Sequence, residues 1–362
     1  MKILSIVGAR PNFMKIKPIY EELKSRKLDQ ILVHTGQHYD ENMSRIFFED
    51  LELPKPDVFL GIGSGTHGVQ TGAMMSRIEE VLTQEKPDLT LVVGDVNSTL
   101  AGAISSIKMQ IPVAHIEAGY RSFDMRMPEE INRVLVDRIS QLLFAPTEDA
   151  VENLMAEGIM KKRIFFVGNI MVETLISHLE KSKKSKILEK LSLEKNSYGI
   201  LTIHRAENTS DSKKLIEIFK VLSKIENRII VPLHPRTMKI LKDMGYLEKL
   251  GGNIIIIEPL GYLDFLALMS NSKFILTDSG GIQEEALMLD IPCITLRENT
   301  ERIVTLKNGA NILVGINGIK LLKAIDDLPN RRIKYPKPPL WDGNVSNRIA
   351  DVIIEQQELL AL

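Results

Sequence analysis

The chain has 362 residues, of which 44% are hydrophobic and 26% are charged, a composition typical of a globular protein long enough for two domains. With 46 Lys and Arg against 47 Asp and Glu, the net charge of −1 gives no reason to expect nucleic acid or an anionic membrane as a partner. An anionic ligand would therefore need local positive charges. The apolar run before Gly8 is too short for a signal peptide or a membrane span, so we expect a cytoplasmic protein.

Short apolar runs alternate with longer amphipathic stretches along the first half of the chain. Continuous rather than alternating apolar runs are typical of parallel strands that are buried on both faces. We predict strands at 2–10, 30–36, 89–95, 112–118, 142–147 and 163–169. The stretches IKPIYEELKSR and VQTGAMMSRIEEVLTQ between them read as helices, so the pattern is a βαβ series.

A second series of the same kind follows. We predict its strands at 197–205, 228–235, 253–260, 273–278, 292–297 and 311–315. The fold class is therefore α/β, with two Rossmann-like doubly wound parallel sheets of about six strands each, in domains 1–168 and 169–345. A helix at 169–181 links them. The lysine-rich stretch 181–195 could bind nucleic acid, but its interspersed Glu and Leu favour a solvated helix.

Polar residues gather where the predicted strands end, and parallel sheets of this kind bind ligands beyond the carboxyl ends of their strands. In the first half these ends carry 8–10, 35–38, Asp95 and Glu117; in the second they carry 204–205, 234–236, 278–281 and Arg297. The natural interpretation is one ligand between two facing domains.

The segment TDSGGIQEEALML is the clearest ligand signal, because its two glycines lead into a helix that begins near Ile282. A helix N-terminus with close backbone approach favours phosphate. A plain turn capped by Ser279 is the alternative. The cations that follow other strands would suit a diphosphate, although each alone could be a surface charge: Arg10, Lys15, His204, Arg205, His234 and Arg236. Glu285 could accept hydrogen bonds from a ribose or simply face solvent.

Three carboxylates mark the first half. Asp95 and Glu117 end strands, and Glu129 opens the segment PEEINRVLVDR. At a crevice such groups could do general acid or base work. Each could instead be a helix cap or half of an ion pair, with Arg121 and Arg133 as partners.

Several other functions lack their motifs. No GxxxxGK[ST] segment is present, and GIGSGTHG does not fit a dinucleotide fingerprint. The sequence HIE resembles the start of a zinc deaminase motif, but no cysteine pair follows. No Asp-x-Asp pair is present, and the single cysteine, Cys293, excludes an intramolecular disulfide and reads as a core residue. We therefore expect no metal and no nicotinamide cofactor.

An ordered set of motifs resembles the non-hydrolysing UDP-N-acetylglucosamine 2-epimerases. The motifs are GARPNFMK, TGQHYD, GDVNST, HIEAGYRS, PEEINR, LFAPTE, VGN, HRAEN, PLHPRT, DSGGIQEEA and RENTER, and the match runs from residue 3 to about 348. The resemblance implies a glycosyltransferase-B-like fold with the active site in the cleft between the domains. It also implies that a C-terminal helix within 346–362 packs back on the first domain.

By position, the resemblance also implies roles for single residues. The residues that would contact the diphosphate are Arg10, Lys15, His204 and His234. The phosphate-binding turn would comprise Ser279, Gly280 and Gly281. Glu285 would hold the ribose, and Arg302 and Gln70 would also contact the substrate. Asp95, Glu117 and Glu129 match the catalytic carboxylates, and His204 could donate a proton to the departing phosphate. Gln37 and His38, like Gln70, occupy positions comparable to those where some members bind a second, activating UDP-N-acetylglucosamine.

The implied reaction is reversible epimerisation at C2, which interconverts UDP-N-acetylglucosamine and UDP-N-acetylmannosamine by elimination of UDP to 2-acetamidoglucal and re-addition. It needs no cofactor. UDP and the sugar nucleotide are the expected partners, and a homodimer is the expected assembly. A hydrolysing epimerase, a glycosyltransferase of the same architecture and a nucleotide-sugar sensor without chemistry remain alternatives.

Overall fold

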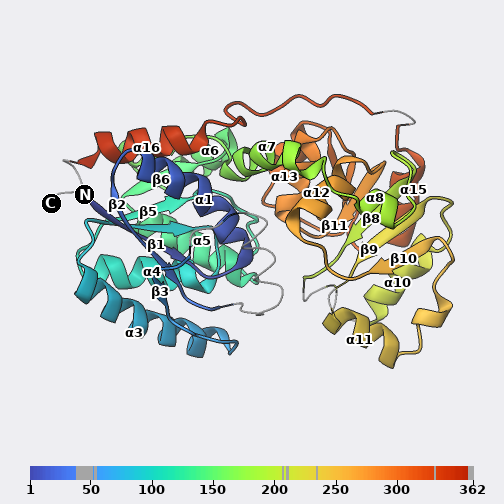
Figure 1. Ribbon diagram of the computed structural model, residues 1–362, viewed down its shortest axis with the longest axis horizontal. Helices are drawn as coiled ribbons and strands as arrows, with labels where there is room; N and C mark the ends of the chain where they lie inside the picture. Colours follow the sequence, from blue (N-terminus) through green and yellow to red (C-terminus); the bar gives the residue numbers. More distant parts are fainter. Residues whose placement is uncertain are drawn as a thin grey trace. The chain divides into compact units, whose positions relative to one another are not determined.

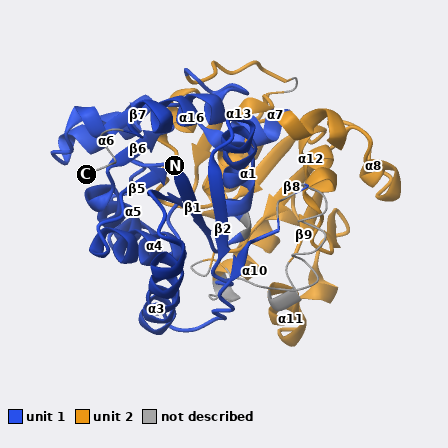
Figure 2. Cartoon of the chain, turned by 60° about the vertical axis from the view of Figure 1, so that its left-hand side comes forward, with its two compact units in different colours: residues 1–176, 339–362 blue, residues 177–338 orange. Residues whose placement is uncertain are grey.

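The structure, a computed structural model (Figure 1), describes residues 1–37, 52, 55–205, 208, 212–233, 235–329 and 332–357, without the side chains of 10, 212, 213, 235 and 236. The chain divides into two compact units, which Figure 2 distinguishes by colour. Unit 1 comprises Met1–Ile176 and Pro339–Leu362, and unit 2 comprises Ser177–Pro338. The chain therefore returns to unit 1 after unit 2 is complete.

Unit 1 is built on a parallel sheet whose described part has seven strands in the order β3-β2-β1-β4-β5-β6-β7. The strands are β1 (Lys2–Val7), β2 (Asp29–His34), β3 (Val58–Phe59), β4 (Leu89–Val93), β5 (Val113–Ile116), β6 (Leu142–Ala145) and β7 (Ile164–Phe166). The sequence predicted six of them. The prediction missed β3 because two residues are too few to form a recognisable apolar run.

The helices of unit 1 cover both faces of this sheet. They are α1 (Arg10–Ser25), α3 (His67–Glu85), α4 (Asn97–Lys108), α5 (Pro128–Ile139), α6 (Glu148–Ala156) and α16 (Val345–Glu355), with a 3₁₀ turn at Lys161–Arg163. Figure 1 shows α1 and α16 on one side of the sheet and α3 and α4 on the other. The helix α7 (Ile170–Ser182) carries the chain into unit 2.

The C-terminal segment is held in unit 1 by specific polar contacts as well as by packing. Arg26 of α1 pairs with Asp351 of α16 at 2.6 Å, and the backbone N–H of Ser346 donates to Glu173 at 2.7 Å. The indole N–H of Trp341 donates to the carbonyl of Pro146 at 3.0 Å. These bonds tie α16 and the residues just before it to segments far away in the sequence.

Unit 2 repeats the same architecture with six strands among its described residues, in the order β10-β9-β8-β11-β12-β13. The strands are β8 (Tyr198–Thr202), β9 (Arg228–Pro232), β10 (Ile254–Ile257), β11 (Phe274–Thr277), β12 (Cys293–Thr295) and β13 (Asn311–Leu313). The helices are α8 (Ile187–Lys190), α10 (Ser212–Leu222), α11 (Pro235–Asp243), α12 (Tyr262–Ser270), α13 (Gly280–Met288), α14 (Ile303–Lys307) and α15 (Gly318–Asp326), with a 3₁₀ turn at Leu247–Lys249. The predicted α/β class with two Rossmann-like parallel sheets is confirmed.

Two local predictions need correction or refinement. The stretch 181–195 is not one helix, because α7 ends at Ser182 and only Ile187–Lys190 is helical beyond it. Cys293 lies in β12 and is 1% exposed, and burial raises the pKa of its thiol to about 12, which agrees with a core role. Among the described helices, none combines the length and the apolar character needed to cross a bilayer.

Candidate active site

The strand order of each sheet reverses direction at one point, where a crevice opens beyond the strand ends. In unit 1 this point lies between β1 and β4. Asn12, in the first turn of α1, spans it: its Oδ1 accepts from the backbone N–H groups of Gly8 at 3.2 Å and Ala9 at 2.9 Å, and its Nδ2 donates to the carbonyl of Val93 at 2.9 Å. Sequence reasoning missed Asn12, since a single asparagine after a strand carries no distinct pattern.

Lys15 and Glu117 form a buried ion pair next to Asn12. Their side chains are 10% and 6% exposed, and Lys15 Nζ donates to Glu117 Oε2. A Cβ at Gly94 would lie 3.4 Å from Lys15 Nζ and 3.5 Å from Glu117 Oε2. The backbone that leads to Asp95 therefore passes directly beside this pair. The structure thus brings together the ends of β1, β4 and β5, as the sequence predicted.

Glu117 has a backbone φ of +73°, which lies in the left-handed region that residues other than glycine rarely adopt. Conformations of this kind persist where the surrounding contacts over-determine them, and they gather at functional sites.

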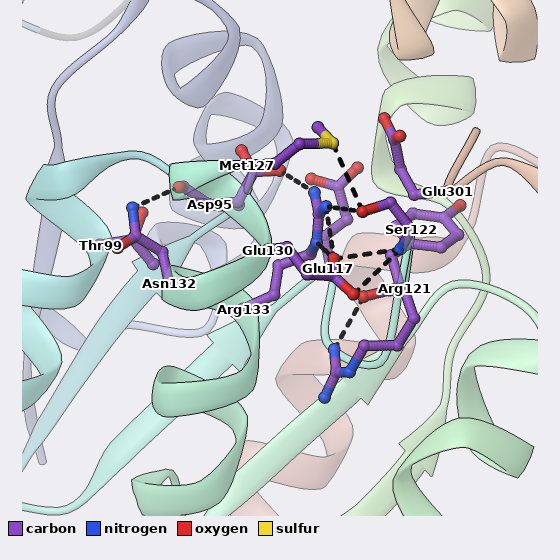
Figure 3. A network of polar contacts seen from close by, with 12 residues as sticks. Asp95, Thr99, Glu117, Arg121, Ser122, Met127, Glu130, Asn132, Arg133 and Glu301 are labelled. Atoms are coloured by element: carbon purple, nitrogen blue, oxygen red, sulfur yellow. Dashed lines mark hydrogen bonds and ion pairs between the residues drawn. The ribbon is translucent and has the colours of Figure 1, made fainter. Parts of the chain in front are cut away.

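Asp95 is held by an arginine of α5. Nη1 of Arg133 lies 2.5 Å from Asp95 Oδ2, while Nε and Nη2 of Arg133 lie 2.8 and 2.6 Å from Oε2 of Glu130 (Figure 3). Glu130 also accepts from the backbone N–H groups of Ser122 and Phe123. One buried guanidinium is thus shared between two carboxylates, which fixes the position of both. Of the two arginines considered from the sequence, Arg133 is the partner of Asp95.

Glu129 differs from the other two predicted carboxylates. It is the second residue of α5, it is half-buried, and it makes no hydrogen bond or ion pair with any described residue. Asn132, one turn further along α5, donates to the backbone carbonyl of Asp95 at 2.8 Å, so α5 is anchored at the end of β4.

Gln37 and Gln70 are both buried and both bonded within unit 1. Oε1 of Gln37 accepts from the backbone N–H of Ser98 at 3.0 Å and from its hydroxyl at 2.6 Å. Nε2 of Gln70 donates to the carbonyl of Gly63 at 2.9 Å, and its Oε1 accepts from Asn97 at 3.0 Å. Their amides connect the end of β2 with α3 and α4. His38 lies outside the described residues.

In unit 2 the strand order reverses between β8 and β11, and one carboxylate, Asp278, spans this point. Asp278 is fully buried and accepts from the backbone N–H groups of His204 and Arg205 at 3.0 to 3.2 Å, and from the side chain of Asn208 at 3.0 Å. Burial alone would raise the pKa of Asp278, but the bonds and charge of His204, Asn208 and Arg205 outweigh it and lower the pKa. Sequence reasoning placed Asp278 in the turn and missed this role.

His204 is the exposed part of this arrangement. Its Nδ1 lies 3.0 Å from Oδ1 of Asp278, while 60% of its side chain is exposed. The buried carboxylate thus orients an imidazole whose remaining surface can meet a ligand. His234 lies outside the described residues, and the side chains of Arg10 and Arg236 are not described.

The predicted phosphate-binding turn begins α13. The helix starts at Gly280, and Ser279 is its N-cap residue but makes no side-chain capping bond. A Cβ at Gly280 would lie 2.6 Å from Oε1 of Glu301, whereas a Cβ at Gly281 would meet nothing within 4 Å. The backbone is therefore tightly packed at one glycine and open at the next. A plain turn capped by the Ser279 side chain is not what the structure contains.

Two further predicted binding residues lie close to α13. Glu285 is 5% exposed and accepts from the hydroxyl of Tyr262 at 3.0 Å, so it does not face solvent. Nε of Arg302 lies 3.0 Å from Oε1 of Glu284. Arg297 pairs with Glu301 at 2.9 Å, which places a second buried ion pair near the start of the helix.

Among the described residues, no group of three or more His, Cys, Asp or Glu is arranged to hold a metal ion. The profile of the UDP-N-acetylglucosamine 2-epimerases matches residues 21–354. The chain belongs to this family. The resemblance inferred from the ordered motifs is thereby confirmed.

Two similar proteins support the assignment. A UDP-N-acetylglucosamine 2-epimerase of Methanocaldococcus jannaschii is 49% identical, covering 98% of this chain and 99% of that protein. A UDP-2,3-diacetamido-2,3-dideoxy-D-glucuronate 2-epimerase of Pseudomonas aeruginosa is 42% identical, covering 98% of this chain and 99% of that protein.

Solved structures agree. The M. jannaschii epimerase in complex with UDP-GlcNAc and UDP has a TM-score of 0.92 at 48% identity, covering 98% of this chain and all of that one. The glycosyltransferase of kitacinnamycin, at 10% identity and a TM-score of 0.56, shares the fold alone.

Proposed function

We propose that this protein interconverts UDP-N-acetylglucosamine and UDP-N-acetylmannosamine by inverting C2, and that it does so without releasing free sugar. One observation carries the proposal. The carboxylates Asp95, Glu117 and Glu129, which the ordered family motifs mark as catalytic, lie at the ends of β4 and β5 and the start of α5, and buried cations hold two of them in place. Family membership supplies the substrate class.

The chemistry of the substrate dictates the order of steps. The hydrogen on C2 is not next to a carbonyl, so a carboxylate cannot remove it directly. Breakage of the C1–O bond, with UDP leaving with the electron pair, makes C1 positively charged and the C2 hydrogen acidic. Loss of that proton to an enzyme carboxylate gives 2-acetamidoglucal. Addition of UDP to C1 and of a proton to the opposite face of C2 completes the inversion.

The carboxylates of unit 1 are suited to different steps of this reaction. Asp95, whose Oδ2 is bound by Arg133, is suited to stabilise positive charge at C1. Glu117 and Glu129 remain to exchange protons with C2. The buried position of Glu117 and the absence of a described partner for Glu129 both favour transfer over purely structural roles.

The residues of unit 2 suit the leaving diphosphate. We assign Ser279, Gly280, Gly281 and Arg302 to UDP phosphate binding and Glu285 to the ribose, and His204, oriented by Asp278, donates a proton to the departing phosphate. Arg10, Lys15, Gln70 and His234 are assigned to substrate by their family motifs. No cofactor takes part in these steps, and a homodimer is the assembly we propose.

Proton NMR in D2O tests the proposal with UDP-N-acetylglucosamine as substrate. We expect UDP-N-acetylmannosamine that carries deuterium at C2, with no free sugar. Free N-acetylmannosamine and UDP would show a hydrolysing epimerase. Binding without turnover at high enzyme concentration would show a sensor, and transfer to an added acceptor would show a glycosyltransferase. Product without deuterium would contradict the elimination mechanism.

The same assay decides the sugar. The relative from P. aeruginosa is named for a diacetamido-glucuronate, so both sugar nucleotides should be compared. A higher kcat/KM for the diacetamido-glucuronate would overturn the proposed substrate while leaving the C2 chemistry in place.

A further inference from the structure

A buried cluster of charged side chains lies behind the carboxylates of unit 1, and no step assigned above uses it. We call it the His115 cluster, and it comprises His115 of β5, Arg121, Asp137 of α5 and Glu157. His115 and Asp137 are fully buried and Arg121 is 2% exposed, while the side chain of Glu157 is 34% exposed. The sequence analysis noted His115 only as part of a zinc motif that has no cysteines.

Both ring nitrogens of His115 face acceptors. Nδ1 lies 2.6 Å from Oδ1 of Asp137, and Nε2 lies 2.8 Å from the backbone carbonyl oxygen of Gly94. A carbonyl oxygen can only accept a hydrogen bond. The proton between Nε2 and Gly94 must therefore belong to the histidine.

Asp137 is also restricted to accepting. Its Oδ2 accepts from the backbone N–H of Gly119 at 3.1 Å and from Nη1 of Arg121 at 2.7 Å. Burial alone would raise the pKa of Asp137, but His115 and Arg121 outweigh it and lower the pKa. Arg121 and the N–H of Gly119 occupy Oδ2 independently of His115, which favours an ionised carboxylate, and the proton between Asp137 and Nδ1 then also belongs to His115.

We propose that His115 is a permanently doubly protonated imidazolium and that it is a positioning residue for Asp95 and Glu117. The charges of the cluster support the first part. With a doubly protonated His115, two cations face the two carboxylates Asp137 and Glu157, and Arg121 contacts both oxygens of Glu157 at 2.6 and 2.7 Å. The cluster is neutral as a whole, as burial of charge requires.

The contacts of the cluster explain the positioning role, which rests on the proposed function. His115 holds the carbonyl of Gly94, directly before Asp95, and Asp137 holds the N–H of Gly119, two residues after Glu117. Gly94, Glu117 and Gly119 all have left-handed φ values, of +70°, +73° and +88°. The His115 cluster therefore fixes both left-handed turns. By fixing them, it also sets the distance between the two carboxylates, Asp95 and Glu117.

A second buried histidine provides an internal reference. His34, 4% exposed, packs against the rings of Phe13 and Phe59 at centroid distances of 4.8 and 5.1 Å. Burial lowers the pKa of His34 to about 4, so its imidazole is neutral at physiological pH. Two buried histidines of unit 1 are thus expected to differ in charge, His115 being positively charged and His34 neutral, because their partners differ.

Nitrogen-15 NMR of protein labelled only at histidine tests the charge. The chain has seven histidines, and the signals of His115 and His34 are assigned from H115N and H34N. At neutral pH we expect both ring nitrogens of His115 to carry protons, and only one of those of His34. A single protonated nitrogen on His115 would overturn the imidazolium. D137N should remove the second proton, and retention of both would overturn the role of Asp137.

Kinetics test the positioning role. H115Q keeps a donor near the place of Nε2, and H115N keeps one near the place of Nδ1, so each variant breaks one of the two contacts. We expect each to lower kcat by about 10-fold to 100-fold, as a misplacement of catalytic groups does. KM and the Kd of UDP should not change, and H34N, the matched buried control, should keep the wild-type kcat.

The outcomes separate this inference from the proposed function. If wild-type protein has no epimerase activity, the proposed function fails and the NMR result still decides the charge. If the wild type is active and folded H115Q and H115N keep its kcat, the positioning role is wrong. If kcat, UDP affinity and Tm all fall together in these variants, His115 has a purely structural role. Should both His115 variants fail to fold, E157Q provides the kinetic test at the exposed end of the cluster.

Discussion

The two sheets end in opposite charge arrangements, although their strand orders are alike. At the crevice of unit 1, buried cations hold the carboxylates: Lys15 pairs with the buried Glu117, and Arg133 pairs with the partly exposed Asp95. At the crevice of unit 2, a buried carboxylate, Asp278, holds the exposed His204. The same architecture thus places carboxylates held by cations at one crevice and an imidazole held by a carboxylate at the other.

The comparison shows how a nearly neutral chain can carry two charged sites. A buried charge is tolerated when a partner of opposite sign is close, so each buried charge at these crevices is paired with the group that it holds. The buried partner, which is Lys15 or Arg133 in unit 1 and Asp278 in unit 2, then decides which kind of side chain is held at each crevice.

The largest expected effect is on the carboxylate side. Glu117→Gln keeps the size of the side chain but removes its capacity for proton transfer, so we expect kcat to fall by about 100-fold to 10,000-fold. The affinity for UDP should change little, because the phosphate-binding turn and the ribose contact are assigned to unit 2, and the isosteric glutamine can still accept a hydrogen bond from Lys15. Turnover by NMR and UDP binding by calorimetry measure the two effects. A large loss of UDP affinity would break the comparison and make Glu117 structural.

The matching change in unit 2 is Asp278→Asn. It removes a charge that accepts several hydrogen bonds, so we expect a loss of about 1 to 3 kcal/mol in the free energy of unfolding, together with weaker UDP binding. Urea unfolding and calorimetry measure these effects. Unchanged UDP affinity would contradict the view that Asp278 orients ligand-binding groups.

The pH dependence of that stability loss has a defined sign. The pKa of Asp278 is lower in the folded protein than its unfolded value of about 3.9. Its contribution is therefore present above that value and is lost as the pH falls through the folded pKa. The difference in unfolding free energy between wild type and D278N should shrink below about pH 3.9. A difference that grows there would show that Asp278 is not held ionised.

The two glycines of α13 provide a smaller and well-matched test. A methyl group at Gly280 would lie 2.6 Å from Glu301, so G280A should cost about 1 to 3 kcal/mol in unfolding free energy. G281A meets nothing within 4 Å and should be neutral or stabilise the helix by up to about 1 kcal/mol. Equal effects of the two substitutions in urea unfolding would contradict the close packing at Gly280.

The smallest expected stability effect is that of Ser279→Ala. An N-cap serine normally contributes about 1 kcal/mol through its capping bond. Ser279 makes no such bond, so the change in unfolding free energy should stay under about 0.5 kcal/mol. UDP affinity should nevertheless fall, because the hydroxyl is assigned to phosphate. Loss of stability without loss of affinity would mean that Ser279 is a cap after all.

The sequence by itself determined the α/β class, the parallel strands and the location of the candidate groups at strand ends. This was possible because continuous apolar runs mark buried parallel strands, and the residue that follows such a run must lie at the crevice edge. Asp95, Glu117 and the DSGG turn were all found in this way. Among the strands that the structure describes, only β3, with two residues, was too short to carry the signal.

Only the tertiary structure decided which charges are partners. His115 and Asp137 are 22 positions apart, Arg133 and Asp95 are 38 apart, and Asp278 lies 74 positions from His204. Local periodicity contains no information on such contacts, because they depend on which strands become neighbours and on how each helix returns over the sheet. The pairing of carboxylates with buried cations in unit 1, and of His204 with the buried Asp278 in unit 2, is therefore a property of the fold and not of any motif.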